Sequence, residues 1–322
     1  MTINITKSFE KILNQIVKKY NLNSLLIAIS GGQDSICLIK LLEQFNKQKH
    51  FIKKIEYLYI DHQWKKDSKI QAEHLINYMK QQKKFSIYQI KKISISENTS
   101  RIYRYHTIID HAIKYNYDAI ITAHTQTDKL ETFIQNLVRG TTIEGATSLN
   151  LYRKLNEKLY LFRPLISNHR QELNFFCRKY CLPIWSDNTN YNYNIKRNRI
   201  RYEVIPYFNK YLNKKIEYNL IKFLESCHYD HEYIKHISII NYINNKHYKY
   251  IALNYRNIQN NHIAIQTRII QLFIHHNLYI FIDKYLLYQL LKILNNKINT
   301  TIKWKKIKFA ITTNWIYITL IK

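Results

Sequence analysis

An apolar run that breaks into a pair of glycines limits the fold of this 322-residue chain more than any other stretch. The run covers 25–29 and leads through Ser30 into Gly31 and Gly32, two of only four glycines. A buried parallel strand that turns into a helix has this pattern, and 35–45 continues with helical apolar spacing. Glycines let the backbone of such a turn approach a ligand, and the first N–H groups of the helix then face it. The turn predicts an anion site, which the scarcity of glycine favours over an ordinary tight turn.

Asp34 stands inside this predicted anion site, where its carboxylate would repel a bare phosphate. It fits if a divalent cation bridges it to the phosphates, as in Mg-ATP, or if it orients backbone groups. The Walker and dinucleotide-binding glycine patterns are both absent from the sequence. The string Ser30-Gly31-Gly32-Gln33-Asp34-Ser35 resembles the Ser-Gly-Gly-x-Asp-Ser loop of the PP-loop (N-type) ATP pyrophosphatases, whose members adenylate a substrate and release pyrophosphate.

The charge balance indicates a polyanionic partner. Lys and Arg number 50 against 22 Asp and Glu, a formal net charge of +28 that exceeds what solubility requires. After Tyr233 the only acidic residue is Asp283, so a nucleic-acid backbone would neutralise the lysines of this tail. An AT-rich genome, which inflates Lys, Ile, Asn and Tyr, explains part of the same bias, and the two explanations are compatible.

The cysteines and the hydropathy argue against several classes of protein. Cys37, Cys177, Cys181 and Cys227 show no disulfide, zinc or iron–sulfur spacing, so reduced, structural thiols are expected. No apolar run reaches the roughly 20 residues of a membrane span, and no signal-peptide core begins the chain. We expect a soluble protein without membrane contact.

Strands and helices alternate over the first part of the chain. Helices are expected at 4–20, 35–45, 68–82, 98–115 and 126–139, and strands at 25–29, 54–60, 85–90 and 118–124. This alternation predicts an α/β fold with a doubly wound, mostly parallel sheet whose loops gather at one edge.

Polar residues end two of these strands. Asp61 and His62 follow 54–60, and His124 ends 118–124. Because the carboxyl ends of parallel strands line the ligand crevice, we interpret Asp61 and His62 as adenosine contacts. A strand-end Asp that caps a turn is the alternative.

Two pairs of charged residues have helical spacing. Arg101 and Arg104 are three apart, which suits a bound phosphate or carboxylate but also a solvated face. Asp128 and Glu131 share one face near a helix N-terminus. There they either hold Mg²⁺ or an ammonium group, or simply balance the helix dipole.

The ordered set of motifs resembles that of the tRNA(Ile)-lysidine synthetase family over roughly residues 20–210. Besides the glycine loop, the matching segments are Asp61-His62, Ser100 to Tyr105, Ala123 to Thr132, Arg139-Gly140, Arg163-Pro164-Leu165, Ser186 to Asn190 and Arg197 to Arg201. The chain departs from the family at Ser100, Thr125, Thr127 and Lys129, where the family has Ala, His, Asp and Gln. The resemblance implies an adenine nucleotide alpha hydrolase-like PP-loop domain over 1–215.

The same resemblance implies a ligase that uses ATP and Mg²⁺ to modify tRNA. The wobble cytidine of tRNA(Ile) with a CAU anticodon would be adenylated at its C2 oxygen. The ε-amine of free lysine would then displace AMP and leave lysidine, which pairs with A and changes the identity of the tRNA from Met to Ile.

The resemblance also implies a role for each matching residue. Asp34, Arg104, Asp128 and Glu131 would be catalytic, with Asp34 and Asp128 at Mg²⁺ and Glu131 accepting a proton from lysine. ATP would contact Ser30, Gly31, Gly32, Gln33, Asp34, Ser35, Asp61, His62 and His124, and tRNA or phosphate would contact Arg101, Arg139, Arg163, Arg197 and Arg201.

The match is weak from residue 216 onward. The region 216–322 is expected to form a small, mainly helical or α+β domain that contacts tRNA. Helices are expected at 218–224, 263–274 and 285–293, followed by one or two strands over 303–320 whose aromatic residues fill a core rather than stack on bases. A homodimer stays open.

Two other functions stay open. One is a PP-loop enzyme that thiolates tRNA, which would need activated cysteines or a cluster. The other is a basic RNA-binding protein with an inactive ATP fold. Against it stands the joint presence of Ser30, Asp34, Ser35, Asp128 and Glu131. The composition and the short C-terminal region favour the plastid stroma (chloroplast) over a bacterial cytoplasm.

Overall fold

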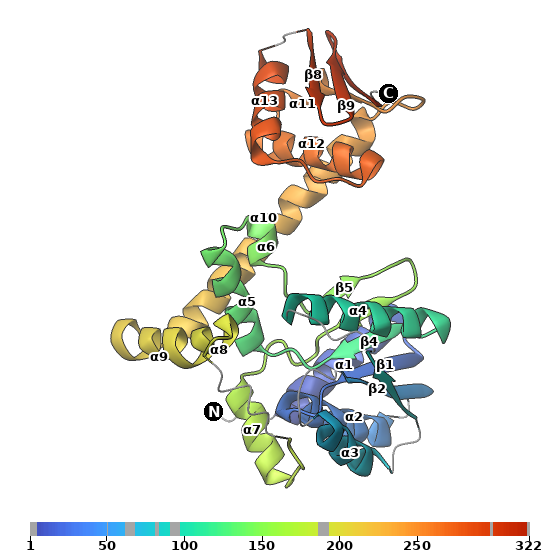
Figure 1. The fold of residues 1–322 in the computed structure, drawn as a ribbon, viewed down its shortest axis with the longest axis vertical. Helices are drawn as coiled ribbons and strands as arrows, with labels where there is room; N and C mark the ends of the chain where they lie inside the picture. The colour runs from blue at the N-terminus through green and yellow to red at the C-terminus, as the bar shows by residue number, and fades with distance from the viewer. Residues whose placement is uncertain are drawn as a thin grey trace. The chain divides into compact units, whose positions relative to one another are not determined.

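The computed structural model describes residues 5–49, 51–61, 68–80, 84–90, 97–185, 193–296 and 299–320. The chain divides into two compact units, Met1–Phe223 and Leu224–Lys322 (Figure 1), with the division inside a long helix rather than at 215. Among the described helices, none is both long enough and apolar enough to cross a membrane.

A six-stranded sheet forms the centre of the N-terminal unit. Its strands are β1 (Ser24–Ile29), β2 (Lys54–Asp61), β3 (Phe85–Gln89), β4 (Ala119–Thr122), β5 (Tyr152–Lys154) and β6 (Tyr160–Phe162). The spatial order is β3-β2-β1-β4-β6-β5, and all neighbours are parallel except the edge pair β5 and β6. The predicted doubly wound, mostly parallel sheet is confirmed.

Helices cover both faces of this sheet (Figure 1). The helices up to residue 179 are α1 (Ile5–Tyr20), α2 (Gln33–Lys49), α3 (Ser68–Met79), α4 (Glu97–Lys114), α5 (Gln126–Val138), α6 (Ile143–Ala146) and α7 (Arg170–Lys179). Further along, α8 (Lys196–Arg199) continues without a break through a π-helical turn η2 (Ile200–Val204), α9 (Ile205–Tyr207) and a second π-helical turn η3 (Phe208–Leu212). The helices predicted at 4–20, 35–45, 68–82, 98–115 and 126–139 correspond to α1 to α5.

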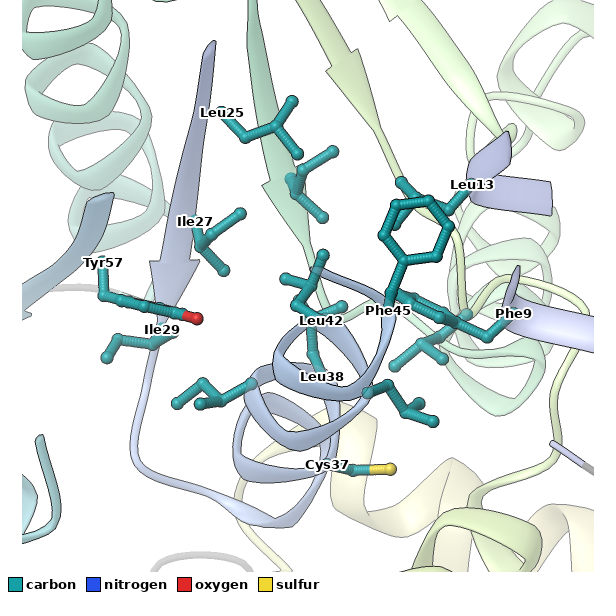
Figure 2. Close-up of a cluster of buried hydrophobic side chains, with 14 of the residues drawn as sticks. Phe9, Leu13, Leu25, Ile27, Ile29, Cys37, Leu38, Leu42, Phe45 and Tyr57 are labelled. Carbon is teal, nitrogen blue, oxygen red and sulfur yellow. The ribbon is translucent and has the colours of Figure 1, made fainter. Parts of the chain in front are cut away.

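The central strand β1 is buried on both faces, as its uninterrupted apolar run predicted. Leu25 and Ile27 join the cluster formed with α1 and α2 (Figure 2), while Leu26 joins a second cluster under α4. Alternation of side chains along the strand sends neighbours to opposite faces. Phe9 and Phe45 fill the first cluster from α1 and α2.

The strand order reverses between β1 and β4. Chain connections leave these two neighbouring strands toward opposite sides, so their carboxyl ends open onto a crevice that no crossover fills. The loop after β1 and the residues after β4 lie at this crevice.

The C-terminal unit is built on a four-stranded antiparallel sheet in the order β7-β10-β9-β8. Its elements are the end of α10 (Ile216–Asn245), β7 (Ala252–Asn254), α11 (Tyr255–Ile258), α12 (Ile263–Leu278), α13 (Lys284–Asn295), β8 (Thr300–Trp304), β9 (Ile307–Ile311) and β10 (Trp315–Leu320). Leucines and isoleucines of α12 and α13 pack on the sheet around Phe273 and Phe309.

Several sequence-based boundaries in this region were wrong. The helix expected at 218–224 is one part of the 30-residue α10, and the expected one or two strands over 303–320 are three. The helices expected at 263–274 and 285–293 are confirmed as α12 and α13. Strand β7 has only three residues, too few to show a period.

Candidate functional site

The glycine loop between β1 and α2 is fixed by side chains on both sides. Gly31 has φ +75°, a conformation that costs little only for glycine, and an added Cβ would lie 3.4 Å from Gln71 Nε2. Gln71 Nε2 donates to the Ser30 carbonyl at 2.9 Å, and the Ser35 hydroxyl donates to the Gly32 carbonyl at 2.8 Å. These two hydrogen bonds therefore fix the conformation of the loop up to the start of α2.

Asp34 lies in the first turn of α2 and is largely buried. Its Oδ2 is 3.8 Å from Arg170 Nε, at the start of α7. Within the part of the chain that the structure describes, no hydrogen-bond partner reaches its buried Oδ1. Burial raises the pKa of the Asp34 carboxyl to about 6, and the Arg170 guanidinium opposes this rise. An unsatisfied carboxylate oxygen at a helix start is suited to a cation.

Two carboxylates of α5 and two arginines of the segment after α7 form an ion cluster, defined here as Asp128, Glu131, Arg197 and Arg201. Arg197 donates through Nε to Glu131 at 2.5 Å and through an Nη to Asp128. Arg201 donates through Nε to the other Glu131 oxygen at 2.5 Å. The Glu131 side chain is completely buried, so both of its oxygens are used inside the protein.

The spacing of the two arginines explains how one segment serves both acids. Arg197 in α8 and Arg201 in η2 are four residues apart and face α5 together. Burial works against ionisation of Asp128, but Arg197 and neighbouring donors hold its pKa below the usual range. The Asp128 carboxylate is thereby kept ionised, and both acids are paired with guanidiniums.

Thr125 joins this cluster to the beginning of α5. The Thr125 N–H and hydroxyl both donate to Asp128 Oδ2, at 2.7 and 3.0 Å, and the Thr125 oxygen accepts from the Asp128 N–H. This is a capping box, which satisfies the free N–H groups of the helix start. The family's His at this position is thus replaced by a residue with a local structural task.

His124 sits between the two strand ends as a neutral side chain. Burial, together with nearby arginines, lowers the pKa of His124 to about 3 against the opposing effect of Asp128. The Thr122 hydroxyl lies 2.9 Å from its Nδ1. His124, Asp34, Ser30 and Arg104 line a cavity of about 210 Å³ at the crevice between β1 and β4.

The remaining predicted residues are distributed around this cavity. Arg104 of α4 lines both the cavity and a larger cleft, and Asp61 ends β2 in a buried position at that cleft. Arg101 lies 5.8 Å above the Tyr105 ring, and Arg163 is buried and donates to a backbone carbonyl. Arg139 is exposed just after α5. His62 and the motif at 186–190 lie outside the described residues.

The larger cleft has a volume of about 1370 Å³ and includes the glycine loop. Ser30, Gly32 and Asp34 line it, and its wall also carries Lys210, Lys214 and Lys215. The wall gains further length from Trp185 and Tyr218. A long polyanion that reached the glycine loop would pass these lysines.

Two residues at the loop escaped the sequence analysis. Gln71 is one polar residue among many on α3, and only the fold brings it to the Ser30 carbonyl. Arg170 follows the Arg163-Pro164-Leu165 motif and reaches Asp34 from more than a hundred residues away. Its place at a helix start, in a segment next to a recognised motif, was the available signal.

The cysteines support structure rather than chemistry. Cys37 of α2 and Cys177 of α7 are buried, and Cys177 Sγ donates to the Gln33 carbonyl at 3.7 Å. A hydrogen bond with Cys177 and burial raise the pKa of the Cys37 thiol. Cys181 lies beyond the end of α7 and is exposed.

Comparisons with known proteins agree with the fold and the loop. A family model described as a PP-loop domain matches residues 5–208. A U34-tRNA thiolase from Methanococcus maripaludis has a similar fold, with a TM-score of 0.55 and 14% identity over 69% of this chain and 76% of that one. The N-terminal unit is therefore a PP-loop domain, a class that binds ATP.

Curated sequences narrow the class. A chloroplastic tRNA(Ile)-lysidine synthase from Gracilaria tenuistipitata var. liui is 46% identical over 96% of this chain and 97% of its own length. Another from Pyropia yezoensis is 35% identical over 93% of this chain and 90% of its own length. The chain belongs to the tRNA(Ile)-lysidine synthase family, whose members are tRNA-modifying ligases.

Proposed function

We propose that the protein ligates lysine to C2 of the wobble cytidine of tRNA(Ile) with a CAU anticodon. The reaction consumes ATP in two steps, adenylation of the cytidine with release of pyrophosphate and displacement of AMP by lysine. One observation carries the proposal: Ser30 and Asp34 of the glycine loop line one cavity together with Asp128 and Arg197 of the ion cluster, at the crevice between β1 and β4. The relatives named as tRNA(Ile)-lysidine synthases supply the substrate.

We assign the ATP phosphates to the loop Ser30–Ser35, with the backbone of Gly31 and Gly32 and the first N–H groups of α2 as donors. Arg104, at both cavities, would stabilise charge that develops on the leaving pyrophosphate, with Arg101 beside it. The adenosine would lie against Asp61, His62 and His124. His124 is neutral, so it can donate or accept a hydrogen bond without adding charge.

Magnesium fits one of its two predicted ligands. The buried Asp34 Oδ1 lacks a hydrogen-bond partner among the described residues, and Mg²⁺ prefers one or two carboxylates together with substrate phosphates. When bound, the ion would offset phosphate charge. Asp128 is already engaged by Arg197 and by Thr125, so a metal there would have to replace one of these bonds.

Lysine must attack as a neutral amine, so its ammonium must first give up a proton. The new bond joins the lysine nitrogen to C2 as the bond from C2 to the adenylate oxygen breaks, and AMP leaves with the electron pair. We propose that Asp128 and Glu131 hold the ammonium and that Glu131 takes the proton. Both carboxylates share Arg197, which must therefore release one of them when lysine enters.

The basic residues have different access to tRNA. Arg139 is exposed and is proposed as a direct contact, together with the cleft wall of Lys210, Lys214 and Lys215. Arg163 is buried, and we propose that it supports the site through its contact with the Asn150 carbonyl rather than by touching RNA. Arg197 and Arg201 would meet phosphate only as they leave the ion cluster.

The test incubates the full chain with ATP, lysine and a tRNA(Ile) transcript bearing CAU, followed by mass analysis of the anticodon nucleosides. Lysidine is expected with the unaltered chain and not with Asp34→Asn, while the exposed acid of α4 gives a matched control, Asp110→Asn, with full activity. A sulfur-containing product would establish thiolation instead. Exchange of pyrophosphate into ATP that needs no tRNA would exclude adenylation of the cytidine.

Two further assignments are proposals of the same kind. The chloroplastic relatives support a plastid location, with the stroma as the compartment of its tRNA. A homodimer is kept as the quaternary proposal, which sedimentation of the purified chain would decide.

A further inference from the structure

Four aromatic side chains stand in solvent within ten residues of the C-terminal unit. They run from the end of α12 into α13, and we call them the aromatic strip: Tyr279, Phe281, Tyr285 and Tyr288, which are 83%, 85%, 72% and 67% exposed. Single exposed aromatics are ordinary on a protein surface, but a group with this exposure usually has a partner.

The strip is separate from the core that holds its helix in place. α13 directs five leucines inward, and Tyr285 and Tyr288 occupy the opposite face three residues apart. Tyr279 has φ +56° at the end of α12, a conformation that tyrosine rarely adopts. His275 contacts Phe281 with ring centroids 4.6 Å apart and Tyr279 at 6.3 Å. Tyr279 and Phe281 are therefore grouped around His275 without being buried, and Tyr285 and Tyr288 follow on α13.

The charged residues next to the strip are mainly basic. Lys284 and Lys292 are exposed on α13, and Lys292 continues the face that carries Tyr285 and Tyr288. After Tyr233 the sequence holds eleven lysines and two arginines but a single acid, Asp283. Asp283 Oδ1 accepts the Leu286 N–H at 2.8 Å as the N-cap of α13, where the helix dipole offsets its charge.

We propose that the aromatic strip binds unpaired bases of the tRNA substrate, with Lys284 and Lys292 on the adjoining phosphates. The identity of the RNA rests on the proposed function. Exposed flat rings with cations beside them match a single strand, because each base offers a face for stacking and each linkage a negative charge.

A matched pair of tyrosines elsewhere makes the proposal testable. Tyr229 and Tyr233 of α10 are 72% and 68% exposed, the same as Tyr285 and Tyr288, but their neighbours in the chain are Asp230 and Glu232. Acidic neighbours repel RNA, so the two doubles differ in charge setting and not in exposure.

The experiment measures binding of the full chain to a labelled, unstructured 15-nucleotide RNA, to the same RNA as a duplex, and to the tRNA(Ile) transcript. The double Tyr285→Ala/Tyr288→Ala should weaken single-strand binding about tenfold or more and duplex binding less than twofold. Tyr285→Phe/Tyr288→Phe should keep the affinity, and Tyr229→Ala/Tyr233→Ala should change it less than twofold. Melting temperatures should stay unchanged, since all four side chains are exposed.

Lysidine formation separates this proposal from the one on which it rests. If the strip contacts tRNA, the double raises KM for tRNA about tenfold and leaves kcat and KM for ATP within twofold. If the alanine double at the strip loses single-strand binding while the unaltered protein makes no lysidine, the RNA-binding role of the strip would stand and the proposed enzymatic function would be refuted. Equal effects of the two alanine doubles, or a strip variant that only converts a dimer to a monomer, would overturn the strip as an RNA surface.

Discussion

The ion cluster in the N-terminal unit and the aromatic strip in the C-terminal unit use charge in opposite ways. In the cluster, Glu131 is fully buried and its two oxygens are matched by two guanidiniums. Beside the strip, Lys284 and Lys292 stand in solvent, and the single acid of that region caps a helix. Buried charges must be paired within the fold, whereas clustered exposed charges of one sign are available to bind oppositely charged molecules.

This difference predicts how each region responds to substitution and to salt. A buried charge that loses its partner stays poorly solvated. Removing the partner should therefore cause a large loss of stability that does not depend on salt. An exposed cation loses only a screened attraction, so its effect should be small and should vanish at high salt. The four predictions below run from the largest effect to the smallest.

Asp34→Asn should lower kcat/KM for ATP by about 10²–10³-fold, because the amide keeps the shape of the carboxylate but cannot hold a cation. Steady-state rates of pyrophosphate release with saturating tRNA measure this. The Asp110→Asn control should retain its rate. A tenfold or smaller loss would contradict a role for the Asp34 carboxylate in holding a cation during the reaction.

Arg201→Ala should lower the free energy of unfolding by about 3 kcal/mol, since it leaves the buried Glu131 with one guanidinium instead of two. Denaturant unfolding followed by tryptophan fluorescence measures this loss. Combining it with Glu131→Gln should cost less than the sum of the two single losses. Lys40→Ala, which breaks the surface pair with Glu43 at 3.7 Å, should cost less than about 1 kcal/mol. If the losses of stability from Arg201→Ala and Glu131→Gln were additive, the two residues would not be coupled, and the buried pair would behave like an exposed one.

Asp34→Asn should also stabilise the apoprotein above pH 6, by about 2 kcal/mol. The pKa of Asp34 is raised to about 6 by burial from 3.8, so the folded state keeps a proton that the unfolded state releases. Stability contributed by that proton is present at low pH and is lost as pH rises from about 4 to 6. Melting curves of both chains should therefore coincide near pH 4 and diverge up to pH 7. A constant gap at all pH values would show that ionisation of Asp34 is not the cause.

Lys292→Ala should weaken tRNA binding only two- to threefold at low salt and reduce the salt dependence of log Kd by about one unit of slope. Titrations at several salt concentrations measure both quantities. At 0.5 M salt the variant and the parent should bind equally. If the effect persisted at high salt, Lys292 would make a buried contact with the RNA, and its salt dependence would resemble that of the buried ion cluster.

The sequence predicted the framework of the catalytic unit because its signals are local. The run at 25–29, the glycine pair and the helical spacing after Gly32 each lie within a few residues, and β1 and α2 form as expected. Strands β5 and β6 were not predicted, since three residues show no period and their pairing depends on β4.

The site residues were recognised individually, but their partners were not. The acids Asp128 and Glu131 and the arginines Arg197 and Arg201 appeared as separate groups, one for metal or lysine and one for tRNA. Their pairing joins residues about seventy positions apart, and spacing along the chain carries no information about that distance. In the C-terminal unit, the strand aromatics drew attention, while the exposed rings on α12 and α13 carry their signal only when burial is known.

The capping box at Thr125 gives the start of α5 a second duty. Asp128 uses one oxygen to close the helix end and the other to hold Arg197, so a ligand that draws this carboxylate away also loosens the first turn. If lysine binds to Asp128 as proposed, amide protons at 125–128 should exchange faster with deuterium in the presence of lysine. The exchange rate of these amides would thus report whether a ligand occupies the site.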